Sequence, residues 1–231
     1  MREIFTLLFI LPLTIHSQEK IDITCFTLGF VDDYLGRDFV ISEKENPKTI
    51  DHIHKDEELI IKYLDSLIKV DNLSKNTIEN IDFKYFKDSI TLNCGNCDEF
   101  YFLNSKKLAL KINNFYYLKP TEIQEVNNPK PEQLTYFAYL NEKKIKTENQ
   151  RKSFLYGAFL RYGNIENGAY TITLANSVSK FDVLKKILKK IKCKIIKTTE
   201  NVDLIPNSQI IYFNTKNNEI ISTLNKLLVK N

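Results

Sequence analysis

Three prolines near the middle of the chain are the strongest constraint on how it folds. The stretch "YLKPTEIQEVNNPKPEQLTYF" carries Pro120, Pro129 and Pro131. Proline interrupts helices and is excluded from central strands, because its ring fixes one backbone torsion and removes the amide hydrogen. The stretch therefore predicts a connection between an N-terminal part, residues 18–125, and a C-terminal part, residues 132–231. No strong internal repeat is visible between the two parts.

The N-terminus, "MREIFTLLFILPLTIHSQEK", has the layout of a secretory signal peptide. Arg2 precedes an apolar run, and Ser17 is a small residue at which cleavage before Gln18 is expected. The run is shorter than the roughly 20 apolar residues of a membrane-spanning helix and longer than the roughly 5–6 residues of a usual strand. We expect residues 1–17 to be removed and the mature chain to be exported to the periplasm or beyond the cell. No later stretch is long enough to span a membrane.

The composition permits a substantial hydrophobic core and limits the functions that fit. Of 231 residues, 43% are hydrophobic and 12% are aromatic. The 33 basic and 29 acidic residues leave a formal charge of +4, a balance that argues against a dedicated polyanion binder. The patterns of nucleotide-binding glycine loops, serine hydrolases, zinc proteases and EF-hands do not occur in the sequence.

Hydrophobic periodicity predicts the α+β class. In the N-terminal part, "DEELIIKYLDSLIKV" has the period of a helix, and "FKYFKDSITLN", "DEFYFLN", "KLALKI" and "NFYYLK" have the composition of antiparallel strands. In the C-terminal part the predicted order is helix, strand, helix, strand, strand, helix, with a short extra strand at residues 164–165. The second of these helices, "SKFDVLKKILKKIK", has Ser179 as its expected N-cap. We therefore predict a small α+β unit followed by an α/β layer.

The helix predicted over "TENQRKSFLYGAFLRYG" has small residues where an apolar helix usually has large ones. Ser153, Gly157 and Ala158 would let a second helix approach closely, and Gly163 would cap the helix in the left-handed conformation. A glycine within a helix costs roughly 1 kcal/mol, so a packing reason is expected. The alternative is an ordinary layer in which these residues accommodate a neighbouring strand or helix.

The segment "LYGAFLRYG" resembles the nine-residue helix of LAGLIDADG homing endonucleases at its first Leu, its first Gly and its last Gly. The likeness is closest to the WhiA-type sporulation regulators, through Gly157–Leu160 and Gly163–Ile165, and it covers the C-terminal part only. It implies that a second helix, from the N-terminal part or from another copy of the chain, packs on this one. Active members carry acids near the last glycine that hold a divalent cation, whereas this sequence has Leu160 and Tyr162 there. The resemblance therefore implies a catalytically silent domain without a metal or cofactor.

The sequence "NCGNC" places Cys94 and Cys97 on either side of a two-residue turn between predicted strands. Facing residues of a hairpin lie close enough for a disulfide, and an exported protein favours one. A zinc site and a redox-active or free thiol pair are the alternatives. Cys25 and Cys193 lack the spacing that would supply further zinc ligands.

Three further patterns have plainer interpretations. His52 and His54 would share one face of a strand and suit a metal, but their acidic neighbours favour the solvated start of a helix. Asp32, Asp33 and Asp38 suggest either an acid pair or, more simply, a turn. The run "LKKILKKIKCK" suits a phosphate backbone or an anionic membrane, and its alternating Leu and Ile favour a surface helix with a solvated basic face.

These observations predict an exported, non-enzymatic α+β protein that binds a protein partner or forms a homodimer. Export argues against a nucleic-acid partner. Two alternatives stay open. One is a cytoplasmic nucleic-acid-binding protein, and the other is an envelope enzyme, a thiol oxidoreductase or a hydrolase, that acts through the N-terminal part. No complete catalytic constellation is present, so no catalytic residue is assigned.

Overall fold

The computed structural model describes residues 20–33, 37–40, 49–91, 97–120, 135–204 and 206–228. The predicted signal peptide, residues 1–17, lies outside these ranges, and so does Cys94. Of the helices within the described ranges, none has both the length and the apolar character that crossing a lipid bilayer requires.

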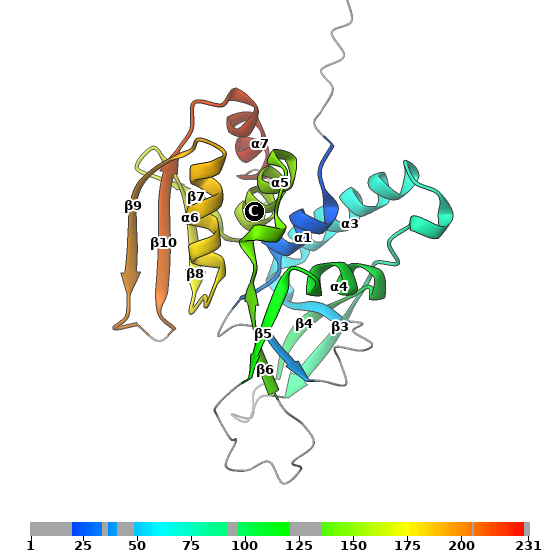
Figure 1. Cartoon of the computed structure of the whole chain (residues 1–231). Coiled ribbons are helices and arrows are strands. Elements are labelled where there is room, and N and C mark those ends of the chain that lie inside the picture. Colours follow the sequence, from blue (N-terminus) through cyan, green and yellow to red (C-terminus); the bar gives the residue numbers. More distant parts are fainter. Residues whose placement is uncertain are drawn as a thin grey trace, which may run out of the picture.

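The first half of the chain alternates helices with pairs of strands (Figure 1). Its helices are α1 (Ile23–Phe30), α3 (Glu58–Leu73) and α4 (Lys106–Asn113). Its strands are β1 (Arg37–Val40), β2 (Thr49–His54), β3 (Lys84–Thr91), β4 (Cys97–Asn104) and β5 (Tyr116–Pro120). Short 3-10 helices occupy Lys55–Glu57 and Thr77–Glu79.

The second half also alternates helices with pairs of strands. Its helices are α5 (Glu148–Tyr162), α6 (Lys180–Lys190) and α7 (Asn218–Leu228), with a 3-10 helix at Glu142–Lys144. Its strands are β6 (Thr135–Leu140), β7 (Gly163–Glu166), β8 (Ala169–Ala175), β9 (Lys194–Asn201) and β10 (Ser208–Asn214). The element order predicted for the C-terminal part is present, and the α+β class with antiparallel strands is confirmed.

The described strands form three antiparallel sheets, with the orders β2-β4-β3, β7-β8-β10-β9 and β1-β6-β5. Pro120 ends β5, an edge strand, where the missing amide hydrogen need not cost a ladder bond. Strand β6 pairs with both β1 and β5, so strands from both sides of the proline-rich stretch share one sheet. The division into parts at this stretch stays a prediction, and the two parts also share one buried core.

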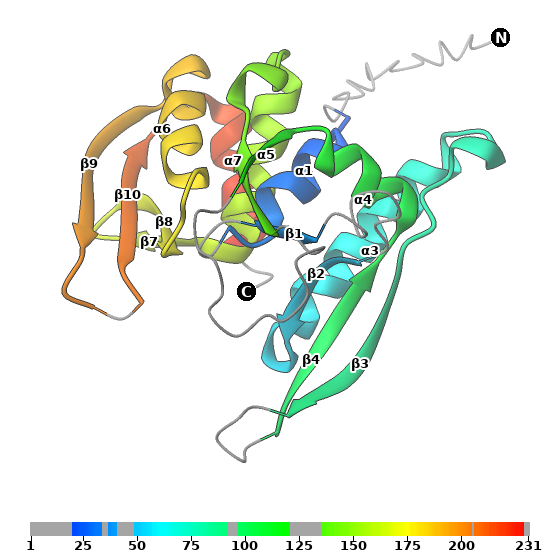
Figure 2. The ribbon, with the colours of Figure 1, turned by 60° about the horizontal axis from the view of Figure 1, so that its bottom comes forward.

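One topology occurs twice along the chain. The order α1-β1-β2-α3-β3-β4-α4 recurs as α5-β7-β8-α6-β9-β10-α7, and the sheet order β2-β4-β3 matches β8-β10-β9. Figures 1 and 2 show α1 and α5 side by side between the sheets β7-β8-β10-β9 and β2-β4-β3. The repeat is not visible in the sequence, because the halves share the order of elements rather than the residues.

Residues 107–112 were expected to form a strand, and this expectation is wrong because they lie in α4. The Ser105 hydroxyl caps this helix by accepting a hydrogen bond from the Leu108 amide at 3.1 Å. The Ser105 hydroxyl in turn donates a hydrogen bond to the Asp82 carboxylate at 2.7 Å. Leu108 and Ile112, one helical turn apart, are both buried. The capping serine and this spacing favour a helix over a strand.

Helix α1 has no counterpart among the elements predicted from sequence. It is capped by Asp22, whose carboxylate accepts a hydrogen bond from the Cys25 amide at 2.9 Å. Seven of its eight residues are buried, so it has no polar face that would reveal a helical period. A helix this short is unstable by itself in water. Its stability therefore comes from packing against its neighbours, above all α5.

Candidate functional site

Two glycines bring α1 and α5 into direct backbone contact. A Cβ atom on Gly157 would lie 1.8 Å from the carbonyl oxygen of Phe26, and one on Gly29 would lie 2.0 Å from that of Phe154. Each glycine thus meets the carbonyl three residues before the other glycine, so a local two-fold axis relates the helices. The second helix expected from the sequence is α1, which belongs to the N-terminal part of the same chain.

The other predicted packing residues lie at or beside this contact. Ala158 is fully buried, and the Ser153 hydroxyl accepts a hydrogen bond from the Asp22 amide at 2.9 Å. Gly163 does not adopt the left-handed conformation that was predicted, because strand β7 begins at this residue and its backbone is extended, with φ −89° and ψ 148°. Glycine is needed there for space, since a Cβ would lie 2.3 Å from the carbonyl oxygen of Phe159.

Asp33 joins the end of α1 to the start of α6. Its buried carboxylate accepts hydrogen bonds from the Ser177 hydroxyl at 2.7 Å, the Ser179 amide at 2.8 Å and the Lys180 amide at 2.7 Å. Ser179 stands at the N-cap position as predicted, but its own side chain makes no capping bond. The cap comes instead from Asp33, whose negative charge is favourable at a helix N-terminus.

Lys180 lies fully buried beneath the C-terminal end of α1. Its ammonium donates hydrogen bonds to the carbonyl oxygens of Gly29, at 2.9 Å, and of Val31. Such carbonyls are left unpaired by the end of a helix, so Lys180 serves as a cap. Burial lowers the pKa of Lys180 to about 8, and the carboxylate of Asp33 opposes this shift.

Arg161, near the end of α5, makes a second link to the first half. Its guanidinium donates to the Asp51 carboxylate at 2.8 Å and to the Glu57 carboxylate at 3.2 Å. It also donates to the carbonyl oxygen of Phe30 at 3.3 Å. Asp51 accepts a further bond from the Asp32 amide at 2.8 Å. The side chains of Arg161 and Asp51 are each 8% exposed, so the pair is shielded from water.

Tyr162 and Leu160 occupy the positions at which an active helix of the resembled family carries acids. Leu160 is part of the buried core. The Tyr162 hydroxyl is buried and has no hydrogen-bond partner among the described residues, and burial raises its pKa. The carboxylates of Asp33 and Asp51 are occupied by amides, hydroxyls and a guanidinium. Across the described ranges, no three His, Cys, Asp or Glu side chains are placed to share a metal ion. This arrangement connects the two halves and offers no set of cation ligands.

His52 and His54 share one face of strand β2, where the favoured interpretation had put them at the start of a helix. The aspartate candidates do not join them. His54 lies 3.2 Å from the Asp56 carboxylate and accepts a bond from the Asp56 amide at 3.4 Å, at the start of the segment that leads into α3. His52 is exposed on β2, and Asp38 lies in β1. Asp32 does not act together with Asp33 as an acid pair, because its carboxylate accepts the Asp33 amide at 2.7 Å while Asp33 caps α6.

The two buried cysteines, Cys25 and Cys193, do not form a redox pair. Cys25 and Cys193 are free and buried, so they do not pair. Burial raises the pKa of both thiols, which disfavours the reactive thiolate. Cys97 begins β4, and its predicted partner Cys94 lies outside the described residues. Sequence reasoning singled out the four cysteines and Asp33, whereas it gave no sign of Asp51, Arg161 and Lys180 or of the charged links that tertiary packing makes through them.

Exposed lysines gather where α6 ends and β9 begins. We call this group the basic ridge, and it consists of Lys186, Lys189, Lys192, Lys194 and Lys216. The neighbouring lysines differ, since Lys185 pairs with Asp182 and Lys190 pairs with Glu142. Within the described residues, no member of the ridge takes part in such an ion pair. The ridge therefore presents positive charge to the surroundings.

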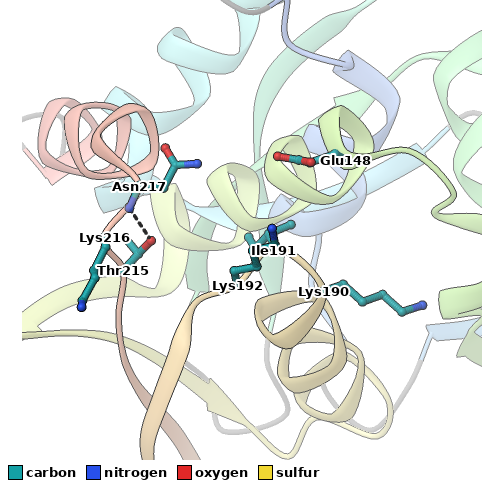
Figure 3. Close-up of a pocket in the computed structure, with 7 residues that line it drawn as sticks. All are labelled: Glu148, Lys190, Ile191, Lys192, Thr215, Lys216 and Asn217. Carbon is teal, nitrogen blue, oxygen red and sulfur yellow. Dashed lines mark hydrogen bonds between the residues drawn. The ribbon is translucent and has the colours of Figure 1, made fainter.

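A pocket of about 290 Å³ opens beside the basic ridge (Figure 3). Its lining consists of Glu148, Lys190, Ile191, Lys192, Thr215, Lys216 and Asn217. In Figure 3 the side chains of Lys190 and Lys216 extend in opposite directions. The Asn217 side chain already caps α7, accepting hydrogen bonds from the Glu219 amide at 3.0 Å and the Ile220 amide at 3.2 Å. The pocket is thus a hollow in a basic surface rather than an enclosed ligand site.

Charge is divided unevenly along the chain. Residues 132–231 contain 17 Lys and Arg but only 8 Asp and Glu, which gives a formal charge of +9. Residues 1–131 contain 16 Lys and Arg and 21 Asp and Glu, which gives −5. The total of +4 therefore combines a strongly basic half, which carries the ridge, with an acidic one.

No protein-family model matches the chain, and no curated protein is similar to it in sequence. Several solved structures are similar in fold. Mesophilic variants of the homing endonuclease I-DmoI are 14% identical, with a TM-score of 0.48, over 90% of this chain and 95% of that chain. I-DmoI in complex with DNA and Ca is 13% identical, with a TM-score of 0.48, over 89% of this chain and 88% of that chain. I-DmoI in complex with DNA and Mn is 15% identical, with a TM-score of 0.47, over 89% of this chain and 96% of that chain.

These findings correct two expectations. They agree with a LAGLIDADG-like fold, at the level of the fold alone, and extend the likeness beyond residues 132–231. The leading functional hypothesis, an exported non-enzymatic scaffold, is corrected, because two of these similar structures are complexes of a homing endonuclease with DNA. At 13–15% identity the likeness concerns the fold alone. The expectation that nucleic acid is an unlikely partner depended on that hypothesis and is corrected as well.

Proposed function

We propose that this protein binds nucleic acid through its C-terminal half and does not cut it. The observation that carries the proposal is the charge of +9 on residues 132–231, together with the exposed basic ridge. Clustered Lys and Arg are the electrostatic signature of a nucleic-acid-binding surface. The balanced total charge, which argued against a polyanion partner, reflects the acidic first half and not the surface that carries the ridge.

The absence of cleavage is proposed from the residues at the ends of α1 and α5. In place of a pair of free acids, α5 ends in Leu160, Arg161 and Tyr162. The carboxylates of Asp33 and Asp51 are already bonded within the protein. Divalent cations such as magnesium prefer carboxylate and water ligands, and these two carboxylates would first have to give up their present partners.

Fluorescence anisotropy with labelled oligonucleotides over a salt series tests the binding proposal. Each phosphate contact should contribute about 0.9 to the slope of log affinity against log salt for a duplex, and about 0.7 for a single strand. Replacing Lys189 and Lys192 together by Glu should therefore weaken binding and lower that slope by roughly 1.5–2. Incubation of the same oligonucleotides with Mg²⁺ or Mn²⁺ should leave them intact.

A matched control keeps the test specific. Lys111→Glu makes the same change of charge at an exposed position on α4, in the acidic half, and should leave affinity and slope close to those of the wild type. Anionic vesicles serve as the other polyanion. Binding to vesicles but not to oligonucleotides would reject the nucleic-acid proposal, and so would a double variant that binds as the wild type does.

Three finer statements remain proposals. Export through residues 1–17 rests on the sequence layout and competes with the nucleic-acid proposal, and an intact Met1 on protein isolated from the cytoplasm would refute it. The Cys94–Cys97 disulfide rests on the sequence alone, because the strand register places Thr91 and not Cys94 opposite Cys97, and mass mapping under non-reducing conditions tests it. The likeness to sporulation regulators of the WhiA type is proposed from the sequence at residues 157–165 alone.

A further inference from the structure

One face of the sheet β2-β4-β3 carries a continuous array of aromatic rings. The array consists of His52 and His54 on β2, Phe86 on β3, and Phe100 and Phe102 on β4. The strand register places all five on the same side, since Phe102 lies opposite both His52 and Phe86, and Phe100 lies opposite His54. We call this group the ring array.

Helix α3 covers the other face of this sheet. Residues that alternate with the ring array, such as Tyr101 and Leu103, point to that other side. The Tyr101 hydroxyl donates a hydrogen bond there to the carboxylate of Glu58 on α3, and Leu103 is fully buried. Figure 2 shows α3 along one side of the β3–β4 hairpin. The ring array therefore lies on the side of the sheet away from α3.

The rings form a connected, accessible surface. Phe86 and Phe102 are stacked, with centroids 5.5 Å apart and planes at 13°. His52 lies 6.2 Å from Phe102 and 5.8 Å from Phe100, and His54 lies 5.6 Å from Phe100. Phe86 is 48% exposed, and His52 is exposed as well. No aliphatic side chain belongs to the array, so its members share flat π-faces rather than a fitted apolar groove.

We infer that the ring array is a stacking surface for the unpaired bases of single-stranded nucleic acid. This inference rests on the proposed function, because the basic half supplies the attraction for phosphates and the ring array adds contacts to bases. Aromatic side chains bind single strands by stacking, since every base has a π-face and an unpaired base can leave its neighbours. In a duplex those faces are hidden inside the stack. The partner that fits both the basic half and the ring array is thus an unpaired strand of nucleic acid.

The test compares three probes that differ in their bases. They are an oligothymidine of about 15 nucleotides, an abasic strand with the same number of phosphates, and a duplex of the same length. Wild-type protein should bind the oligothymidine more tightly than either of the others. Phe86→Ala should weaken that binding by about 5- to 100-fold, the range expected for one lost stacking contact. It should leave the abasic strand unaffected.

Two further variants make the result decisive. Phe86→Tyr keeps an aromatic ring and should retain wild-type affinity, whereas Leu73→Ala removes an apolar side chain that is 88% exposed at the end of α3 and should change nothing. His52→Ala removes a second, exposed ring and should act as Phe86→Ala does. If oligothymidine and abasic strand bind equally with the usual salt dependence, the stacking surface is rejected while the proposed function stands. If no probe binds, both are rejected.

Discussion

Replacing Gly157 by alanine should separate the two central helices and destabilise the whole chain. The added methyl carbon would lie 1.8 Å from the carbonyl oxygen of Phe26, whereas ordinary contact begins at 3.4 Å. The obstacle is backbone, so no side-chain rotation relieves it, and the helices must move apart by more than about 1 Å in a close-packed core. Three fully buried residues pack at this contact, Phe26, Phe30 and Phe154. They would lose part of their packing between the two helices.

The magnitude follows from two opposing effects. Overpacking a core costs about 1–3 kcal/mol, whereas replacing a helical glycine by alanine gains about 1 kcal/mol of helix propensity. Because the contact joins both halves of the fold, we expect the cost to reach or exceed the upper end of its range, for a net loss of about 2 kcal/mol. Urea unfolding followed by circular dichroism should show a lower midpoint at an unchanged slope.

Gly29 provides an internal control for this reasoning. Its Cβ would lie 2.0 Å from the carbonyl oxygen of Phe154, so Gly29→Ala should cost a similar amount. The double variant should cost at least about 0.5 kcal/mol less than the sum, because helices already forced apart accommodate the second methyl. Gly168→Asn, at a turn with φ +75° and open space around it, should be nearly neutral. Single variants within about 0.5 kcal/mol of the wild type, or strictly additive losses, would refute the close contact.

Three other outcomes are expected. Arg161→Leu should cost about 3–5 kcal/mol in urea unfolding, because it leaves the shielded Asp51 carboxylate without its cation, and a loss below about 1 kcal/mol would contradict a buried link. The pKa of Lys180 is about 8 in the folded protein against an ordinary 10.5. Between these two pH values the unfolded chain therefore binds more protons than the folded chain does. Its contribution to stability should therefore rise by about 3 kcal/mol as pH rises through this window, and Lys180→Met should lack that rise. Cys25 and Cys193 should resist iodoacetamide in the native protein and react after unfolding, whereas rapid native labelling would show that they are accessible.

The helices and strands of the second half follow from local sequence patterns. Helix α6 has an apolar stripe at helical spacing, so Phe181, Leu184 and Leu188 are buried as its sequence implies. The small residues of α5 predict a close neighbour for the same local reason, and Gly157 indeed leaves no room for a Cβ. The strand assigned to residues 107–112 failed because Leu108, Leu110 and Ile112 alternate as in a strand, while Leu108 and Ile112 also lie one helical turn apart. The Ser105 cap favours the helix.

The candidate site was less accessible to sequence reasoning. Adjacent aspartates such as Asp32 and Asp33 indicate a turn, but their partners Ser177 and Lys180 lie more than a hundred residues away. The basic run around Lys189 was visible as a charged helix face, yet the total charge concealed that the two halves differ in sign. Counting charge separately for each half would have revealed it.

The sequence by itself determined the class of the fold, the order of elements in the second half and the missing acids at Leu160 and Tyr162, because periodicity and residue identity are local properties. Tertiary structure alone decided that α1 is the partner of α5, that Asp33 caps α6, and that the ring array shares one open face. These depend on contacts between distant segments. The physical reason is that an eight-residue helix with seven buried residues has no polar face to give it a period. It becomes a helix only where Gly29 and Gly157 let two backbones meet.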